Sequence, residues 1–266
     1  MNILFIGDIV GKIGRKTVGR ILPKLKKGKE IDFVIANAEN AAHGSGMTVK
    51  TVEELLSYGV DFITSGDHAY KRLKQIEIFD KYPVIAPANF SRVPISVGYK
   101  LIKINSKNIL IINLIGRVFM KMPFECPFYK LDEILANFPL PSKNLSAIIV
   151  DMHAEATSEK ICFGYYADKR ISAVLGTHTH IMTADHKITK NSTAYITDVG
   201  MTGMANGSLG LEKEDLIKSY LDNIKRTHII SETGKAIFNA VLISIDEKSG
   251  KALKIKPITK FIEIKN

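Results

Sequence analysis

Acidic, amide and imidazole side chains recur in this sequence directly after short apolar runs. Their carboxylate, amide-oxygen and imidazole groups are ligands of divalent ions such as Mn²⁺, Fe²⁺, Zn²⁺ and Mg²⁺. The candidate metal ligands are Asp8, Glu39, Asn40, Asp67, His153, His178 and His180. Because one ion commonly takes three or four protein ligands, this set favours two ions with a bridging carboxylate. Two such ions can hold a bridging hydroxide as nucleophile and clamp a phosphoryl group during in-line displacement.

Taken singly, most of these residues have simpler explanations. An Asp after a strand commonly caps a turn, and a lone histidine such as His153 is commonly a hydrogen-bonded core residue. The pair His178 and His180 is more informative, because side chains two apart on an extended segment point the same way. His68 could be a further ligand, a capped loop residue or a general acid. Since ligands already crowd this region, we predict that His68 donates a proton to a leaving oxygen.

Alternating strands and helices must bring these residues together. Apolar runs predict strands at Asn2–Ile6, Phe33–Ala36, Asp61–Thr64, Val84–Ala86, Ala147–Val150, Ala173–Gly176 and Ala194–Thr197. Helical spacing predicts helices over Arg15–Lys27, after a cap at Thr48 or Thr51, and over Arg72–Lys81, with a loop at Ile9–Gly14. This rhythm favours a largely parallel sheet in the N-terminal half, and ligands of open α/β sheets bind outside the carboxyl ends of the strands.

The pattern changes in the second half of the chain. Tyr99–Ile104 and Ile109–Asn113 flank a short turn and predict a hairpin. Ala236–Ile245 and Ala252–Ile264 predict two long C-terminal strands. Since no repeat, low-complexity segment or linker interrupts the sequence, we expect one mixed α/β domain over residues 1–266.

Composition narrows the class of protein. With 45% hydrophobic and 24% charged residues, the 266-residue chain is globular rather than disordered. No apolar run approaches the roughly 20 residues that span a bilayer, so no membrane partner is expected. Cys126 and Cys162 stand outside any Cys-x-x-Cys pair, which favours reduced cysteines in a cytoplasmic protein. The net charge of +10 makes an anionic partner such as a nucleotide or RNA plausible, although scattered lysines favour a solvated basic surface.

Two familiar motifs are absent on inspection. Gly7 and Gly11 are separated by only three residues, and Ile13 rather than Ser or Thr follows Lys12, so this segment is not a P-loop. No Gly-x-Ser-x-Gly elbow occurs, which leaves a serine hydrolase unsupported.

Longer motifs carry a resemblance over essentially the whole chain. In order they are GDIVGKIGR, ANAENAAHGSGMT, TSGDHAY, NLIGRVFM, DMHAEATSEK, GTHTHIMTAD and TDVGMTG. They closely resemble the YmdB-like branch of the calcineurin-like metallophosphoesterases. The resemblance implies a four-layer α/β/β/α metallophosphoesterase sandwich with mixed sheets. It also implies a dinuclear phosphodiesterase that hydrolyses cyclic nucleotides, notably 2',3'-cyclic nucleoside monophosphates.

The resemblance also assigns roles to the candidate residues. Asp8, Glu39 and His180 would hold one ion. Glu39, Asp67, His153 and His178 would hold the other, with Glu39 bridging. Asn40 would lie beside the first ion and bind the phosphate, and His68 would assist the leaving oxygen. We expect iron or manganese, with magnesium or zinc as alternatives.

Two positions depart from the related sequences. The wider superfamily begins with Asp-x-His, whereas Val10 occupies the histidine position here, as is usual for the YmdB-like branch. The family also has Gly-Asn-His where this chain has Gly66-Asp67-His68. An ionised carboxylate cannot donate a hydrogen bond to phosphate, as an amide can. We therefore expect Asp67 to lower phosphodiester turnover or to shift the metal preference.

Other interpretations remain open at this point. The chain could be a regulatory RNA- or protein-binding module that retains a metal site with little catalysis, or an enzyme acting on a phosphomonoester or a nucleic acid. Arg117–Phe128 could be an apolar substrate lid, a contact in a homo-oligomer, or core plus a surface loop. Gly200–Gly210 could be a mobile loop near the site.

Overall fold

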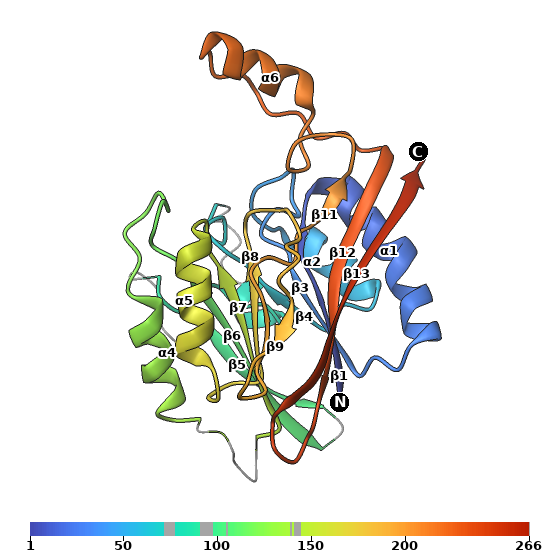
Figure 1. Ribbon diagram of the computed structural model, residues 1–266. Coiled ribbons are helices and arrows are strands. Elements are labelled where there is room, and N and C mark those ends of the chain that lie inside the picture. The colour runs from blue at the N-terminus through green and yellow to red at the C-terminus, as the bar shows by residue number, and fades with distance from the viewer. Residues whose placement is uncertain (72–77, 91–97, 105, 139, 141–144, 266) are drawn as a thin grey trace.

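Two mixed β-sheets face each other, and helices cover their outer faces (Figure 1). The computed structural model describes residues 1–71, 78–90, 98–104, 106–138, 140 and 145–265. The first sheet contains β1 (Asn2–Ile6), β2 (Asp8–Ile9), β3 (Phe33–Asn37), β4 (Phe62–Thr64), β11 (Met201–Met204), β12 (Gly234–Ile245) and β13 (Ala252–Ile264). The second contains β5 (Tyr99–Ile104), β6 (Lys107–Ile115), β7 (Ala147–His153), β8 (Ala173–Thr177), β9 (Lys187–Ile188) and β10 (Ala194–Ile196). The helices are α1 (Gly11–Gly28), α2 (Val49–Ser57), α3 (Ile78–Lys81), α4 (Pro127–Leu135), α5 (Thr157–Ala167) and α6 (Lys213–Asp222).

Parallel strands in both sheets bring the candidate residues to one end of the molecule. In the first sheet β1, β3 and β4 are parallel neighbours, while β12 runs antiparallel beside β1. In the second sheet β6, β7, β8 and β10 are parallel neighbours, and the predicted hairpin of β5 and β6 forms one edge. The carboxyl ends of the parallel strands are where loops can hold a ligand.

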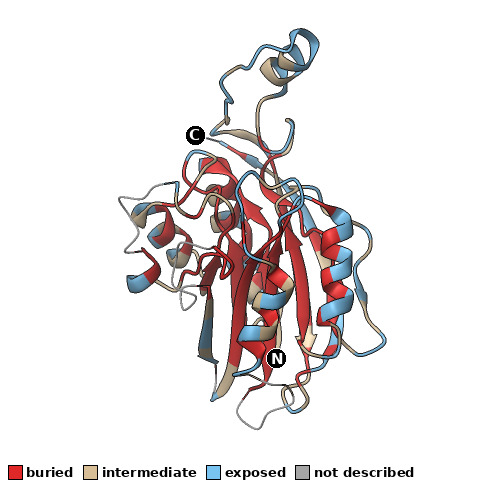
Figure 2. Cartoon of the chain, turned by 90° about the vertical axis from the view of Figure 1, so that its left-hand side faces the viewer, coloured by how far each residue is buried: buried red, intermediate tan, exposed pale blue. Residues whose placement is uncertain are grey.

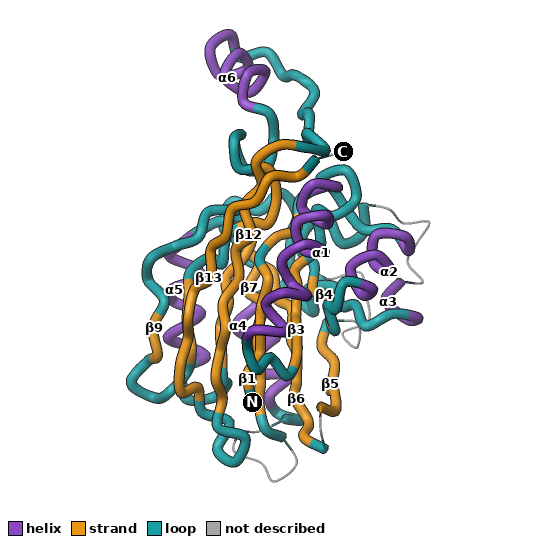
Figure 3. The backbone as a smooth tube through the Cα atoms, turned by 90° about the vertical axis from the view of Figure 1, so that its right-hand side faces the viewer, coloured by secondary structure: helices purple, strands orange, loops and turns teal. Residues whose placement is uncertain are grey.

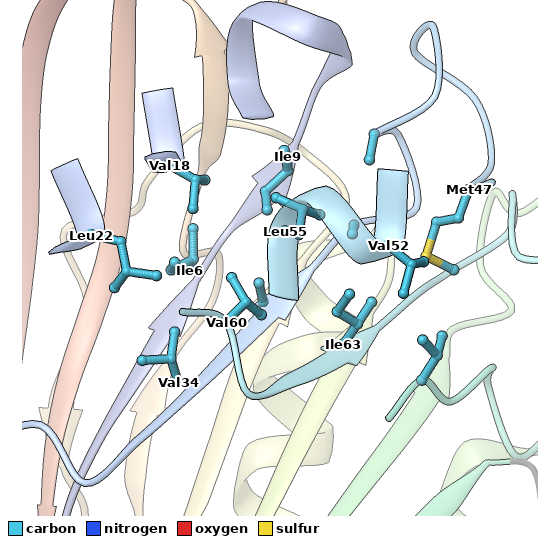
Figure 4. Packing of buried hydrophobic residues seen from close by; sticks show 14 of the residues in the cluster. Ile6, Ile9, Val18, Leu22, Val34, Met47, Val52, Leu55, Val60 and Ile63 are labelled. Atoms are coloured by element: carbon cyan, nitrogen blue, oxygen red, sulfur yellow. The ribbon is translucent and has the colours of Figure 1, made fainter. Parts of the chain in front are cut away.

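Strand β1 shows why the chain forms layers. Its alternate side chains point to opposite faces of the sheet. Leu4 and Ile6 join a buried cluster with Val18 and Leu22 of α1 (Figure 4). Ile3 and Phe5, on the other face, belong to the core between the two sheets. Because both faces of this strand are covered, it reads as an uninterrupted apolar run.

The outer face of the second sheet is covered in the same way by α4 and α5. Leu131 of α4 and Phe163 of α5 pack with Ile148 and Val150 of β7. The helices, two sheets and helices form the four-layer sandwich, and Figure 2 shows the buried strands inside it. The predicted fold class is therefore confirmed. A single domain over residues 1–266 stays a prediction, which the core shared by the sheets supports.

Some predicted boundaries were wrong. Helix α1 begins at Gly11 rather than Arg15, so the predicted loop at Ile9–Gly14 is largely strand and helix. Gly14 lies so close to β11 that a Cβ there would be 2.4 Å from the carbonyl oxygen of Thr202, and the glycine allows this packing.

Three further predictions differ from the structure or lie outside it. In place of the strand at Val84–Ala86, Val84 makes an isolated bridge to Ile63. Part of the predicted loop at Gly200–Gly210 is strand β11. The first residues of the predicted helix at Arg72–Lys81 lie outside the described part of the chain, and α3 forms its end. None of the described helices is both long and apolar enough to cross a lipid bilayer.

Candidate metal centre

The candidate ligands converge from the ends of strands in both sheets. Asp8 follows β1, and Glu39 and Asn40 follow β3. Asp67 and His68 follow β4; from the second sheet, His153 ends β7, and His178 and His180 follow β8. The predicted placement after strands thus brings residues far apart in sequence to one place, although their roles as ligands stay a prediction.

Four of these side chains form one compact group. Glu39, Asp67, His153 and His178 each offer a ligand atom, and these atoms lie within 4.8 Å of one another. Nε2 of His153 is 3.3 Å from Oε2 of Glu39 and 3.4 Å from Oδ1 of Asp67. Nδ1 of His178 is 3.0 Å from the same Nε2. Two imidazole nitrogens and two carboxylates around one point are a donor set suited to a divalent ion.

The other candidates adjoin this group through Glu39 and His178. Nδ2 of Asn40 lies 3.0 Å from Oε1 of Glu39 and 3.2 Å from Nε2 of His180. Asp8 is the first residue of β2, and its Oδ2 accepts a hydrogen bond of 3.1 Å from the backbone N–H of His178. Glu39 therefore contacts both the compact group and Asn40.

Two local features show that this place fits a cation. Among the described residues, Oδ1 of Asp8 is buried and has no hydrogen-bond partner. A buried carboxylate oxygen without a partner is costly unless a cation satisfies it. At Gly66, a Cβ would lie 2.3 Å from both Oε2 of Glu39 and Nε2 of His153. A glycine before Asp67 therefore lets the loop after β4 approach the cluster closely.

The carboxylates of the cluster attract positive charge. Burial alone would lower the pKa of His153, but Glu39, Asp67 and Asp8 outweigh it and raise this pKa to about 10. Burial raises the pKa of Asp8, against the opposing effect of His180 and His153. Burial and the charge of His153 lower the pKa of His178 to about 4. The His178 ring is thus neutral near pH 7, whereas His153 would have to give up its proton to a bound cation, since a metal-binding imidazole is neutral.

His68 lies at the edge of the cluster and is oriented by its neighbours. Its Nδ1 is 2.8 Å from Oδ1 of Asn40, and its backbone N–H donates to Oε2 of Glu39 at 3.1 Å. Burial would lower the pKa of His68, but the hydrogen bond and charge of Glu39 overcome this effect and raise it. The raised pKa favours the protonated ring that a proton donor needs.

The residues that orient the candidate histidine ligands were not predicted from the sequence. Oγ1 of Thr177 donates to Oδ1 of Asp151 at 2.7 Å and therefore accepts from Nδ1 of His153, 2.9 Å away. These two hydrogen bonds keep Nε2 of His153 directed at the cluster. On the other ring, Oε2 of Glu155 is 3.1 Å from Nε2 of His178, which leaves Nδ1 facing the cluster. Such partners orient metal-binding histidines. The sequence contained one signal of this support, namely the acidic residue Asp151 within an apolar strand.

A buried ion pair holds the loop that carries His178 and His180. Both histidines have positive φ, 98° and 65°, a conformation that costs energy in residues other than glycine. Oδ2 of Asp198 accepts hydrogen bonds from the backbone and hydroxyl of Thr179, at 3.0 and 2.8 Å. Nζ of Lys160 donates to the same oxygen and to the carbonyl of Thr177, each at 2.7 Å.

We expect Lys160→Met to destabilise the protein, because it leaves Asp198 charged and buried without its cationic partner. The free energy of unfolding should fall by about 3–5 kcal/mol, measured by urea denaturation. Lys218→Met is the matched control: it removes an exposed pair with Asp215 and should cost less than about 1 kcal/mol. Equal small losses in both variants would show that the buried pair does not hold this loop.

A cavity of about 460 Å³ opens beside the cluster. It is lined by Val10, Glu39, Asn40, His43, Gly44, Ser45, His68, Glu155, His178, Thr179, His180, Leu209, Leu211, His228 and Ile230. Arg117–Phe128, a segment described throughout, contributes none of these residues, so the lid interpretation has no support. Phe124 of that segment is buried, Phe128 is partly buried against the core, and Phe119 is exposed, as expected for core plus a surface loop.

Comparison with known proteins decides the family. A family model described as "YmdB-like protein" matches residues 4–258. The chain belongs to the YmdB-like family. This YmdB-like chain is 44% identical over 259 residues to the 2',3'-cyclic-nucleotide 2'-phosphodiesterase of Bacillus subtilis, covering 97% of this chain and 96% of the relative.

Solved structures share the fold of this YmdB-like chain. One from Mycoplasma pneumoniae, described as a novel phosphatase, is 32% identical with a TM-score of 0.91, covering 99% of this chain and 94% of that one. A calcineurin-like phosphoesterase from Bacillus subtilis, 11% identical, shares the fold with a TM-score of 0.56 over 98% of this chain and 90% of its own. The predicted family, fold class and phosphoester-hydrolase class are confirmed.

Proposed function

We propose that this chain is a metal-dependent phosphodiesterase that hydrolyses cyclic nucleotides, with 2',3'-cyclic nucleoside monophosphates as the substrate class. The convergence of Glu39, Asp67, His153 and His178 within 4.8 Å carries the proposal. The name of the Bacillus subtilis relative supports the substrate. Anionic substrates also suit a chain with a net charge of +10.

Two divalent ions would be held by the cluster. Asp8, Glu39 and His180 would bind one, and Glu39, Asp67, His153 and His178 would bind the other. We expect iron or manganese, with magnesium or zinc as alternatives, and a donor set of imidazole and carboxylate groups suits such divalent ions. When bound, such a pair supplies an activated hydroxide as nucleophile and offsets the charge of the phosphoryl group.

The chain's own residues would perform the remaining steps. Asn40 would direct its Nδ2–H at a phosphate oxygen once its contacts to Glu39 and His180 are given over to the ion. His68, with Nδ1 held by Asn40, would donate the proton on Nε2 to the departing ribose oxygen. For a 2',3'-cyclic substrate this oxygen stays on the sugar, so the product is a nucleoside monophosphate.

The direct test is a substrate screen with protein loaded with Mn²⁺ or Fe²⁺. We expect cleavage of 2',3'-cyclic nucleotides at a kcat/KM well above that for 3',5'-cyclic nucleotides, simple monoesters and RNA. Preference for a monoester or for RNA would replace the proposed substrate. Specific RNA binding without ester cleavage would instead favour a regulatory module. An RNA contact, a homo-oligomer and a cytoplasmic location stay predictions from the sequence.

Asp67 offers a separate prediction. Its carboxylate is close to His153, and despite burial the neighbouring histidines keep its pKa below the usual range. We expect Asp67→Asn to weaken Mn²⁺ affinity by about tenfold and to lower the KM for the anionic substrate, because the amide is uncharged and can donate to phosphate. Titration calorimetry and steady-state kinetics measure both. The exposed Asp80→Asn is the control, and unchanged kcat, KM and metal dependence in Asp67→Asn would discard this role.

A further inference from the structure

An arm formed by residues 205–233 leaves the body at the end of the sheets where the cluster lies (Figures 1 and 3). It departs from β11 and returns to β12, and α6 lies in its outer half. None of the ten residues of α6, all of them described, is buried. The outer half of this α6 arm therefore gains little from packing on the body. The root of the arm, residues 209–212 and 228–232, has a different environment.

The root of the α6 arm forms one wall of the cavity beside the cluster. Leu209, Leu211, His228 and Ile230 line this cavity together with the candidate ligands. Ile230 is inserted against two glycines: a Cβ on Gly44 would lie 2.3 Å from its Cδ1, and a Cβ on Gly11 2.8 Å from its Cγ2. The wall is thus built by close packing between the arm and the body.

Polar contacts hold this root in place and join it to the cluster. Nδ1 of His180 donates to the carbonyl oxygen of Leu209 at 2.9 Å, which leaves Nε2 of His180 facing Asn40. The backbone N–H of Glu212 donates to the carbonyl of Ile229 at 2.9 Å, joining the outgoing and returning segments of the root. Lys12 of α1 forms an ion pair with Glu232. The root is therefore fixed relative to the candidate metal ligands.

The cavity has two chemically different parts. One side presents the carboxylates and imidazoles of the cluster, which suit ions and a phosphate. The side formed by the arm presents three aliphatic side chains and the ring of His228, and His43 lines the same cavity from the loop after β3. Aliphatic surface and imidazole rings are groups on which a planar nucleobase packs and stacks. A volume of about 460 Å³ is in the range of small-molecule sites.

We propose that the root of the α6 arm, with Leu209, Leu211, His228 and Ile230, is the subsite for the base of a nucleotide. The inference rests on the proposed function for placing the phosphate at the cluster. With the phosphate there, the base extends toward Ile230 and His228. The arm then contributes nucleotide affinity, while the cluster binds any phosphate group.

The test measures binding rather than turnover. Mn²⁺-loaded full-length protein is titrated with adenosine 3'-monophosphate and with inorganic phosphate in a calorimeter. We expect the nucleotide to bind more tightly than phosphate. In His228→Ala/Ile230→Ala we expect nucleotide affinity to fall by about tenfold, the effect of losing a stacked base, while phosphate affinity changes less than about twofold.

Two further variants keep the result interpretable. Tyr220→Ala/Leu221→Ala removes apolar side chains of α6 that are 84% and 82% exposed, and it should leave both affinities unchanged. His228→Ala alone changes an exposed residue and should lower nucleotide affinity without affecting folding. Equal affinity of the wild type for nucleotide and phosphate, or a parallel loss of both in the double variant, overturns the subsite. If nucleotide preference depends on the arm but no cyclic nucleotide is cleaved, the proposed function fails and the subsite stands.

Discussion

Replacing His178 and His180 together by alanine is expected to reduce phosphodiester turnover by about a thousandfold or more. The two rings face different parts of the cluster: His178 contacts His153 and Asp67, and His180 contacts Asn40. Their loss would remove one nitrogen ligand from each proposed ion. Metal chemistry contributes several kcal/mol to lowering the barrier, and each 1.36 kcal/mol is about tenfold in rate.

The measurement is kcat/KM on a 2',3'-cyclic nucleotide at saturating Mn²⁺, together with metal content by plasma mass spectrometry. We expect the double variant to lose both bound metal and activity. His186→Ala is the matched control, because His186 is exposed and outside the cavity, and it should keep both. Near-normal turnover in His178→Ala/His180→Ala would defeat the metal assignment.

The second large effect is expected from His68→Gln, which removes the proposed proton donor but keeps a polar side chain. The kcat for a 2',3'-cyclic nucleotide should fall by about 10²- to 10⁴-fold, the usual range for general acid catalysis. For bis(p-nitrophenyl) phosphate the loss should be much smaller, because a nitrophenolate leaves without being protonated. Equal losses on both substrates would show that His68 positions the site rather than donating a proton.

The pH profile tests the same role of His68. Glu39 raises the pKa of His68 above its ordinary value of 6.5, so the ring is protonated below the raised pKa and loses its proton above it. Since the protonated form is the active one, kcat of the wild type should fall as pH rises through that pKa. This alkaline decline should be absent in His68→Gln, and its persistence would assign it to another group.

The position of the candidate residues was predictable, because each follows an apolar strand that the sequence shows clearly. Asp8 and His153 are far apart in sequence and follow or end strands of different sheets. These strands finish at the same end of the sandwich, where Nδ1 of His153 lies 3.9 Å from Oδ1 of Asp8. The four-layer architecture came from the resemblance, and the apolar runs were consistent with it because both faces of β1 are covered.

The supporting residues were not predictable in the same way. Asp151 accepts a hydrogen bond from Asn37 at 3.0 Å across the two sheets, and no spacing within the sequence indicates that contact. Lys160 is a charged residue that nothing local marks as buried, since its partner Asp198 comes from a distant strand end. The α6 arm was not predicted from the sequence. None of the described residues of α6 is buried, so the helix has no core-facing side that a periodic apolar pattern would mark.

The central claim is that this cluster holds two divalent ions that share Glu39. Anomalous diffraction from crystals grown with Mn²⁺ measures this directly. We predict two manganese peaks, one among Glu39, Asp67, His153 and His178 and the other among Asp8, Glu39 and His180. No peak at saturating Mn²⁺, or a single ion that leaves Asp8 and His180 without a ligand role, would contradict the account.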